Sequence, residues 1–342
     1  MENVADVLSG GTQAVGGADK LVVNYAAVLA GITVDLSAAD QVVSMDGSPN
    51  AAIQSGFEDI DLSSFSGFGA VVTGSDGANV ITGTAGTDRI NAGKGNDNVV
   101  SSAGNDQVSG GAGNDTFTFT GALLKANDST TATYDGGTGA NNITISDAVT
   151  TLVDGDFRGI TNVGTLNLAN GTNSITLGTL ATDTAGISSI KGGTGGDTIN
   201  TGVGSHSVET GTGTDDIVVT SSVAAAVDAD ANIKFTTVTD WAANDTLTFT
   251  VGGTNVFTTA AVNVTAATTL KAALDIAVSA AGNTNNQINW FLYDSATWIV
   301  NHVGTGTDLD ALDQVVKLVG TFDLSNETFA EGGAGASTLT FA

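Results

Sequence analysis

The sequence predicts an all-β protein: a parallel β-solenoid followed by a smaller C-terminal module that is β-rich with some helix (α+β). Glycine occurs 46 times against a single proline. Most apolar and semi-polar positions hold Val, Ile, Thr or Ala, which are mostly strand formers. A nine-residue unit also recurs without insertion through residues 74–118. Repetition at a fixed short period indicates a solenoid in which each unit stacks on the one before it.

The first block of repeats holds five consecutive units, GSDGANVIT, GTAGTDRIN, AGKGNDNVV, SSAGNDQVS and GGAGNDTFT. The fourth residue of each unit is glycine, the sixth is Asn or Asp, and the eighth is apolar. The sixth position holds Asn79, Asp88, Asp97, Asp106 and Asp115. The eighth position holds Ile81, Ile90, Val99, Val108 and Phe117. Three columns kept through five units are a strong repeat signal.

A second block of three units, GGTGGDTIN, TGVGSHSVE and TGTGTDDIV, begins at Gly192. Its sixth position holds Asp197, His206 and Asp215, so the histidine interrupts the acidic column. Single units occur at residues 136–144, with Asn141 in the acid position, and more weakly from Leu168. For the isolated units we favour an ordinary tight turn of Gly, Asn and Asp over an ion site.

The spacing predicts the geometry of the repeats. Each unit supplies a six-residue turn and a three-residue strand whose middle residue points inward. Two units then make one coil of 18 residues, and residues 18 apart stack on each other. Asp97 and Asp115 are expected on one side of the coil, with Asp88 and Asp106 on the other. Phe117 is expected to close the inner apolar ladder.

The charge of the chain belongs to these turns. Acidic residues number 36 against nine basic ones, a net charge of −27, and 31 of the acids are Asp, the acid typical of turns. Such a charge argues against nucleic-acid binding. Stacked carboxylates repel one another, and Ca²⁺ relieves this because it accepts six to eight carboxylate and backbone oxygens. Mg²⁺ requires stricter geometry. Zn²⁺ prefers His or Cys ligands, and the chain has two His and no Cys.

The five-unit run resembles the RTX nonapeptide repeat, G-G-x-G-x-D-x-U-x, of calcium-binding β-rolls. The resemblance implies an ion between consecutive turns on the same side, with about three ions in the first block and one in the second. The ligands that it implies in the first block are Asp88, Asp97, Asp106 and Asp115, Asn79 as a weak cap, and the turn residues Gly86, Gly95, Asn96, Gly104, Asn105, Gly111, Gly113 and Asn114. In the second block they are Asp197, Asp215, Gly195 and Gly213. His206 is expected to remove a site.

The rest of the chain divides around the two blocks. We expect irregular solenoid strands in residues 1–70, the first block in 71–120, irregular solenoid in 121–190, the second block in 191–234 and the C-terminal module in 235–342. Periodicity predicts a helix within 265–283, a hairpin that turns at residues 294–296 and a strand at 313–320. Calcium is not expected in the irregular parts.

Chemistry other than ion binding finds no support. There is no H-E-x-x-H and no G-x-S-x-G motif. His206 and His302 lie far apart in the sequence, each without a nearby constellation of charged residues. Asp215 and Asp216 are neighbours on a strand, so their side chains point to opposite faces and cannot act as a glycosidase pair. No enzyme activity, no cofactor besides Ca²⁺ and no membrane span are therefore expected.

The C-terminal end suggests where the protein works. Residues 323–342 are acidic, lack Lys, Arg and Cys, and resemble the uncleaved C-terminal signal of type I secreted proteins, with an ordinary terminal strand pair as the alternative. Residues 287–342 loosely resemble the C-terminal part of RTX-type bacterial surface-layer proteins. This resemblance implies an extracellular, cell-surface protein that self-associates into a lattice, with cell-surface polysaccharide as a further partner. The alternatives are an adhesin or carbohydrate-binding module that uses Trp290, Tyr293 and Trp298, and the non-catalytic secretion and folding domain of a larger enzyme.

Overall fold

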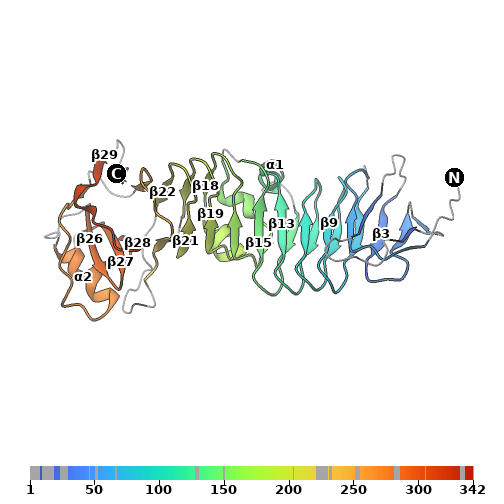
Figure 1. The fold of residues 1–342 in the computed structure, drawn as a ribbon, viewed down its shortest axis with the longest axis horizontal. Helices are drawn as coiled ribbons and strands as arrows, with labels where there is room; N and C mark the ends of the chain where they lie inside the picture. Colours follow the sequence, from blue (N-terminus) through green and yellow to red (C-terminus); the bar gives the residue numbers. More distant parts are fainter. Residues whose placement is uncertain are drawn as a thin grey trace. The chain divides into compact units, whose positions relative to one another are not determined.

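The computed structural model describes most of the chain, and Figure 1 labels its strands and helices. The structure describes residues 8–9, 19–23, 30–45, 47–50, 53–65, 68–127, 131–148, 151–202, 204–220, 230, 233–250, 255–280, 286–304, 306–331 and 336–341. The chain divides into two compact units. The first unit consists of Met1–Ser146, Gly155–Asn167 and Asp183–Gly186. The second consists of Asp147–Asp154, Leu168–Thr182 and Ile187–Ala342. Both units are built mainly from parallel strands, which confirms the predicted fold class.

In the first unit, parallel strands form the rungs on two faces of a solenoid. One face runs through β3 (Ile32–Asp35), β8 (Ala70–Thr73), β10 (Arg89–Asn91), β12 (Gln107–Ser109), β14 (Thr133–Asp135) and β16 (Ile160–Thr161). The hairpin strands β4 (Val42–Met45) and β5 (Ser48–Pro49) extend this face beside β3. The other face runs through β2 (Lys20–Val22), β7 (Asp59–Asp61), β9 (Val80–Thr82), β11 (Asn98–Val100), β13 (Thr116–Phe119), β15 (Asn142–Ile145) and β17 (Thr165–Asn167). A short pair joins β1 (Leu8–Ser9) to β6 (Gln54–Ser55).

The register of these strands confirms the predicted coil. Val80 pairs with Asn98, and Asn98 pairs with Thr116, each 18 residues further along the chain. The helix α1 (Gly121–Ala126) then interrupts the repeat, and Thr120 caps it by accepting a hydrogen bond from Leu123 N at 3.2 Å. The coil that contains α1 is longer, because the next partner of Thr116 is Asn142.

The inner face of the first unit is an apolar ladder, as the eighth column predicts. Its rungs pair in register and are almost fully buried: Ile60, Ile81, Val99, Phe117, Ile143 and Leu166. The expectation that Phe117 closes this ladder is wrong, since two further rungs follow it. Its large ring has a different partner, because it packs edge-on against Tyr134 of β14 with the ring centroids 5.6 Å apart.

The second unit repeats the solenoid pattern and then turns antiparallel. One ladder runs through β18 (Ser174–Thr176), β20 (Thr198–Asn200), β22 (Asp216–Val219) and β24 (Thr246–Phe249), and continues antiparallel into β30 (Ser337–Thr340) and β29 (Thr328–Glu331). The other runs through β19 (Ser189–Lys191), β21 (His206–Glu209), β23 (Thr236–Val238) and β28 (Gln314–Val319). Antiparallel strands β27 (Ala296–His302) and β26 (Gln287–Tyr293) follow, with β25 (Val256–Phe257) parallel to β26. Short helical turns are η2 (Asp154–Phe157), η3 (Leu180–Ala185) and η5 (Leu324–Asn326).

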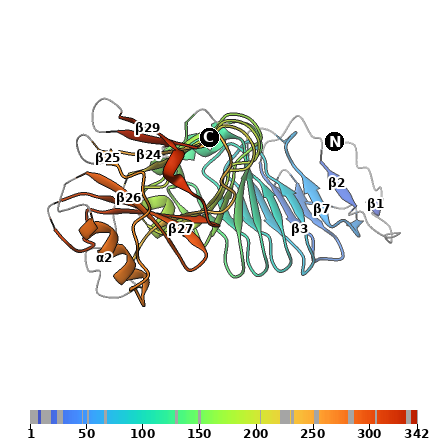
Figure 2. The ribbon, with the colours of Figure 1, turned by 60° about the vertical axis from the view of Figure 1, so that its left-hand side comes forward.

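The C-terminal part of this unit has its own hydrophobic core. The helix α2 (Leu270–Ala280), inside the predicted range, lies along β26 and β27 (Figure 2). Its buried face, which includes Leu274, packs against Phe291, Trp298 and Val300 of these strands. The predicted hairpin is present, and its turn residues Asp294 and Ser295 have φ values of 48° and 57°. Strand β28 confirms the predicted strand at 313–320.

Core packing also accounts for the tryptophans that a sugar site would use. Trp290 is 3% exposed and Trp298 is 4% exposed. The Trp298 indole N–H donates to Tyr293 O at 3.1 Å, and its ring packs against Phe235. These rings therefore form no open stacking surface.

Leu274→Ala should destabilise this C-terminal core by about 2–5 kcal/mol, because it removes a fully buried side chain. Urea unfolding followed by tryptophan fluorescence measures the change. Leu312→Ala, at a position 55% exposed, is the matched control and should change stability by less than about 0.5 kcal/mol. Equal effects of the two substitutions would contradict this assignment of the core.

Candidate functional site: two buried acidic ladders

The turns before β9, β11, β13 and β15 stack their sixth residues in the first unit. We call this set the first acidic ladder: Asn79, Asp97, Asp115 and Asn141. Each backbone N–H donates to the side chain one coil further on, Asn79 N to Asp97 Oδ1 at 2.8 Å and Asp97 N to Asp115 Oδ1 at 2.9 Å. Asp115 N donates in turn to Asn141 Oδ1 at 2.8 Å. The predicted stacking of Asp97 and Asp115 is thus confirmed, and both carboxylates are at most 2% exposed.

The turns before β10 and β12 place Asp88 and Asp106 on the other face, as predicted; we call this pair the opposite column. Ala70 N donates to Asp88 Oδ1 at 2.7 Å, and Asp88 N donates to Asp106 Oδ1 at 2.9 Å. Both carboxylates are buried. The same backbone bond therefore builds both sides of the coil.

The second unit contains a second acidic ladder: Asn173, Asp197, Asp215 and Asp245. Its backbone N–H groups donate to the next Oδ1 at 2.9, 2.8 and 3.1 Å. Sequence reasoning missed Asp245, because residues 240–248 contain no glycine and so hide a further unit. The signal that could have found it is Asn-Asp followed two residues later by an apolar residue, Leu247, as in three units of the first block. Asn244, with φ of 71°, takes a left-handed conformation that glycine usually supplies.

His206 occupies the sixth position of the unit on the other side of this block. It is 3% exposed, and a Cβ placed on Gly204 would lie 3.0 Å from its Cε1 atom. The imidazole therefore fills its own turn, and no carboxylate enters the turn from this position. The expected loss of an ion site there remains a prediction.

Four aspartates of the ladders have a second oxygen without a partner. The Oδ2 atoms of Asp97, Asp115, Asp197 and Asp215 are buried and make no hydrogen bond. A buried, unsatisfied charged oxygen is costly, so these atoms require a proton or a cation. In two of these turns the first residue is a glycine that lies close to the unpartnered oxygen: a Cβ on Gly110 would lie 2.5 Å from Asp115 Oδ2, and a Cβ on Gly192 would lie 2.6 Å from Asp197 Oδ2.

Burial also changes the acidity of these groups. Burial raises the pKa of Asp97 to about 7. The hydrogen bond from the Asn79 backbone lowers this pKa in part, and the Asp115 carboxylate raises it further. Burial likewise raises the pKa of Asp106 to about 7 and that of Asp215 to about 6. The pKa values of Asp115 and Asp197 are raised for the same reason. Without a cation, the ionised ladder is therefore unfavourable near neutral pH.

Backbone carbonyls of the fourth glycines face the next coil. A Cβ on Gly113 would lie 1.7 Å from Gly95 O, so only glycine allows this approach. Likewise, a Cβ on Gly104 would lie 2.3 Å from Gly86 O, and a Cβ on Gly213 would lie 2.0 Å from Gly195 O. The Gly111 carbonyl has another role, because it accepts the N–H of Thr138 at 2.8 Å.

The asparagines that precede the aspartates form an outer amide ladder. Asn96 Oδ1 accepts Asn114 N at 2.8 Å, and Asn114 Oδ1 accepts Ala140 N at 2.8 Å. Asn105 Oδ1 accepts Thr131 N at 3.3 Å. These oxygens hold successive coils together, and a ligand role for them remains a prediction.

The donor atoms at this site fit Ca²⁺ better than a metal ion that needs a compact group of His, Cys, Asp or Glu side chains. Within the described residues, no three His, Cys, Asp or Glu side chains gather closely enough to hold one ion. The carboxylates meet as neighbours in a ladder, so further oxygen ligands would come from the glycine-rich turns. Mixed carboxylate and carbonyl oxygen is the donor set that Ca²⁺ prefers.

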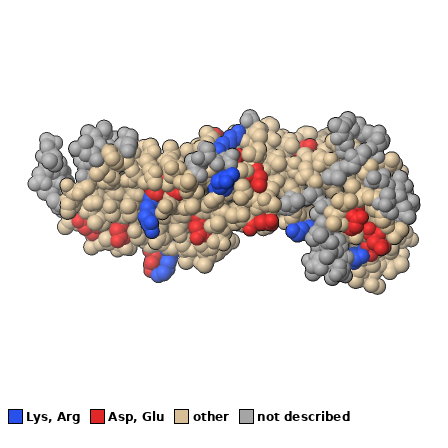
Figure 3. Space-filling model, turned by 180° about the vertical axis from the view of Figure 1, so that it is seen from behind, with Lys and Arg blue, Asp and Glu red and all other residues tan. Residues whose placement is uncertain are grey.

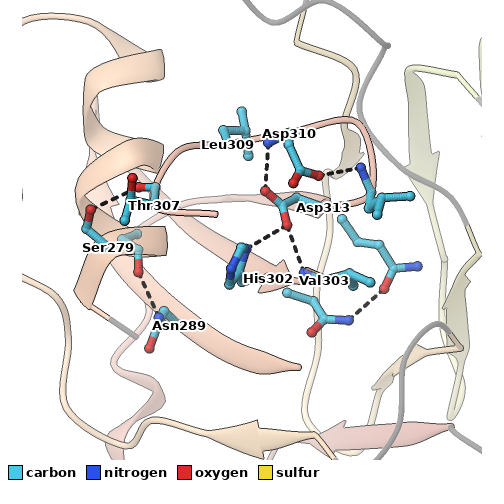
Figure 4. Close-up of polar contacts among 12 residues, drawn as sticks. Ser279, Asn289, His302, Val303, Thr307, Leu309, Asp310 and Asp313 are labelled. Atoms are coloured by element: carbon cyan, nitrogen blue, oxygen red, sulfur yellow. Dashed lines mark hydrogen bonds and ion pairs between the residues drawn. The ribbon is translucent and has the colours of Figure 1, made fainter. Parts of the chain in front are cut away.

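The second histidine belongs to a different, structural contact (Figure 4). His302 Nδ1 lies 2.9 Å from Asp313 Oδ1, and both side chains are fully buried. Sequence reasoning did not anticipate this carboxylate. Asp313 also accepts the N–H groups of Val303 and Asp310, each at 2.8 Å. The pair therefore braces the loop between β27 and β28.

The described surface offers little positive charge. On the face drawn in Figure 3, Lys and Arg side chains are few and scattered. Some of them pair with acids, as Lys94 does with Asp76 at 2.8 Å. Among the described residues, no helix has both the length and the apolar character that crossing a membrane requires.

Acidification from pH 7.5 to pH 4.5 should increase the β structure of the calcium-free protein. The folded-state pKa values lie above the unfolded value of about 3.9, so the folded state binds protons that the unfolded chain does not. Stability from this source is present at the acid end and is lost as the pH rises towards about 7. Circular dichroism in the presence of a chelator measures the effect, and β structure that instead increases with pH would contradict it.

Comparison with known proteins identifies the repeat. Residues 68–99 and 94–119 match the family model of the RTX calcium-binding nonapeptide repeat. No curated protein sequence matches the chain. The match covers the first block, including Asp97 and Asp115, and confirms the RTX character of these units. The second block, which lies outside the match, has the same ladder geometry.

Proposed function

We propose that this chain is a calcium-dependent structural protein of a bacterial cell-surface layer, which folds and self-assembles outside the cell. The observation that carries the calcium dependence is the set of four buried carboxylate oxygens without a hydrogen-bond partner. The RTX match supports it, because that repeat is a calcium-binding repeat.

The two carboxylate oxygens of each ladder aspartate have different roles. Oδ1 of Asp97 and Asp115 holds the backbone of the preceding coil. Oδ2 of each remains for a cation, and the carbonyl of Gly95 lies between the stacked turns. Bound Ca²⁺ supplies the positive charge that offsets the repulsion and the lost hydration of the paired carboxylates.

The size of this effect is sufficient to control folding. A ligand at a hundred times its Kd adds about 2.7 kcal/mol per site, so two sites add about 5 kcal/mol. Folded domains are stable by only about 5–15 kcal/mol. Ion binding can therefore decide whether the solenoid is folded. Where calcium is scarce, the chain stays exportable.

The C-terminal end is compatible with secretion followed by docking. Strand β30 pairs with β24 and β29, and Phe341 packs against Trp241 with ring centroids 4.3 Å apart. A type I secretion signal in this segment would be recognised before the strand docks. In this proposal the segment acts first as the secretion signal and, after export, docks as the terminal strand pair.

The alternatives have less support. An adhesin that stacks sugars needs exposed aromatic rings, and Trp290 and Trp298 are buried. A folding and secretion domain of a larger enzyme uses the same calcium chemistry and remains the second candidate. We propose that the chain itself carries no catalytic site.

Calcium removal tests the proposal directly. Chelation should abolish most β structure of residues 71–120, and millimolar calcium should restore it, because the unpartnered oxygens of Asp97 and Asp115 lose their counter-charge. Circular dichroism together with hydrogen exchange resolved by peptide measures this. An identical folded spectrum with and without chelator would exclude calcium-controlled folding.

Assembly requires a separate measurement. Electron microscopy of the protein after calcium addition should show ordered two-dimensional sheets. Monodisperse particles together with a positive glycan screen would favour the adhesin alternative and contradict the surface-layer role.

A further inference from the structure

We propose that the second residue of each nine-residue unit decides whether its turn needs an ion, and that the ion sites of the first block lie on one side of the coil only. This inference rests on the calcium dependence proposed above. The four turns whose aspartate has an unpartnered Oδ2 share a glycine at that position with positive φ. These glycines are Gly93 (104°), Gly111 (103°), Gly193 (94°) and Gly211 (93°).

Turns of the first block with Ser or Thr at the second position satisfy their own sixth residue. Thr84 N donates to Asp88 Oδ2 at 2.8 Å, and Thr84 Oγ1 donates to Asp88 Oδ1 at 2.6 Å. Ser75 N donates to Asn79 Oδ1 at 2.7 Å in the same way. In these turns, hydrogen bonds from the second residue thus satisfy the side chain of the sixth residue without an ion.

Asp106 of the opposite column receives hydroxyl groups instead. Ser102 Oγ lies 3.5 Å and Tyr134 OH lies 3.4 Å from Asp106 Oδ2. Ser102 Oγ also lies 3.2 Å from Asp88 Oδ2, so its one proton is shared between the two carboxylates of the column. Neutral donors therefore occupy the place that an ion takes in the acidic ladders.

The physical cause is the direction of one N–H group. Ser and Thr adopt the extended or right-handed conformation, in which the backbone N–H of the second residue can point to the side chain of the sixth residue. A left-handed glycine turns that N–H elsewhere. Gly211 shows this, because its N–H donates to Asp240 Oδ2 at 2.8 Å and not to Asp215.

The ends of both ladders lack the unpartnered oxygen. Asn79 and Asn141 are neutral, and Asn141 donates its side-chain amide to Asn162 O at 3.0 Å. Asn173 is neutral as well. Asp245 has both oxygens occupied, by Asp215 N at 3.1 Å and Ala242 N at 2.9 Å. One carboxylate pair remains in each ladder, Asp97 with Asp115 and Asp197 with Asp215. This gives fewer sites in the first block than the family pattern implies.

Single Asp→Asn variants of the full chain test the assignment. Asn141 already accepts the ladder bond through its amide oxygen, so these variants should keep the coil register. We expect Asp97→Asn to bind about one calcium ion fewer than the unsubstituted chain. The matched control, Asp88→Asn, should bind the same number. Equilibrium dialysis against calcium, with metal analysis of the retained protein, gives the count.

A gain of binding provides the second test and keeps every carboxylate in place. The double variant Thr84→Gly and Ser102→Gly should bind about one ion more, because it removes the Thr84 and Ser102 hydroxyls from the opposite column, leaves only that of Tyr134, and lets both second residues take the left-handed conformation. It should also require more calcium to fold, which circular dichroism measures along a calcium titration.

The outcomes separate the two proposals. If the unsubstituted chain binds no calcium, the proposed function fails. If it binds calcium but Asp88→Asn loses an ion as Asp97→Asn does, or the double glycine variant gains none, only the role of the second residue is overturned.

Discussion

The hydrogen bond from a backbone N–H to an aspartate Oδ1 one coil further on is the interaction on which the rest of the solenoid depends. It recurs in the first acidic ladder, the second acidic ladder and the opposite column at 2.7–3.1 Å. It sets the register of the strands and buries the carboxylates. By using one oxygen of each carboxylate, it also determines that the second oxygen must find its own partner. In the proposed function, folding and ion binding are coupled at that atom.

Such coupling would let a chain with a net charge of −27 form a tightly stacked fold. The charge does not all face water, since the acids of the ladders are buried against the turns above and below them. The proposed cation between stacked turns would compensate charge where burial makes it most costly. The core around α2, in contrast, consists of apolar side chains.

The ladders are also limited in length. Neutral amides end the first acidic ladder at Asn79 and Asn141, and Asn173 begins the second. Where the ladder ends in an acid, Asp245, backbone N–H groups satisfy both oxygens. Each ladder therefore keeps one pair of carboxylates, Asp97 with Asp115 and Asp197 with Asp215, whose Oδ2 atoms lack a partner. The insertion of α1 after the first block does not break the apolar ladder, because the strands resume their register in β15.

The sequence alone determined the period, the coil of 18 residues, the two-sided placement of the aspartates and the elements around α2. These depend on local periodicity, which a nine-residue repeat and a 3.6-residue helix both display. Tertiary structure decided which carboxylate oxygens lack a partner, because the partners of Asp88 and Asp106 include Ser102 and Tyr134, which lie 14 and 28 residues away. It also decided the place of Asp245, whose turn takes its left-handed conformation from Asn244 in place of glycine. These side-chain contacts, unlike the backbone bond to Oδ1, do not repeat with the sequence, and so the repeat could not predict them.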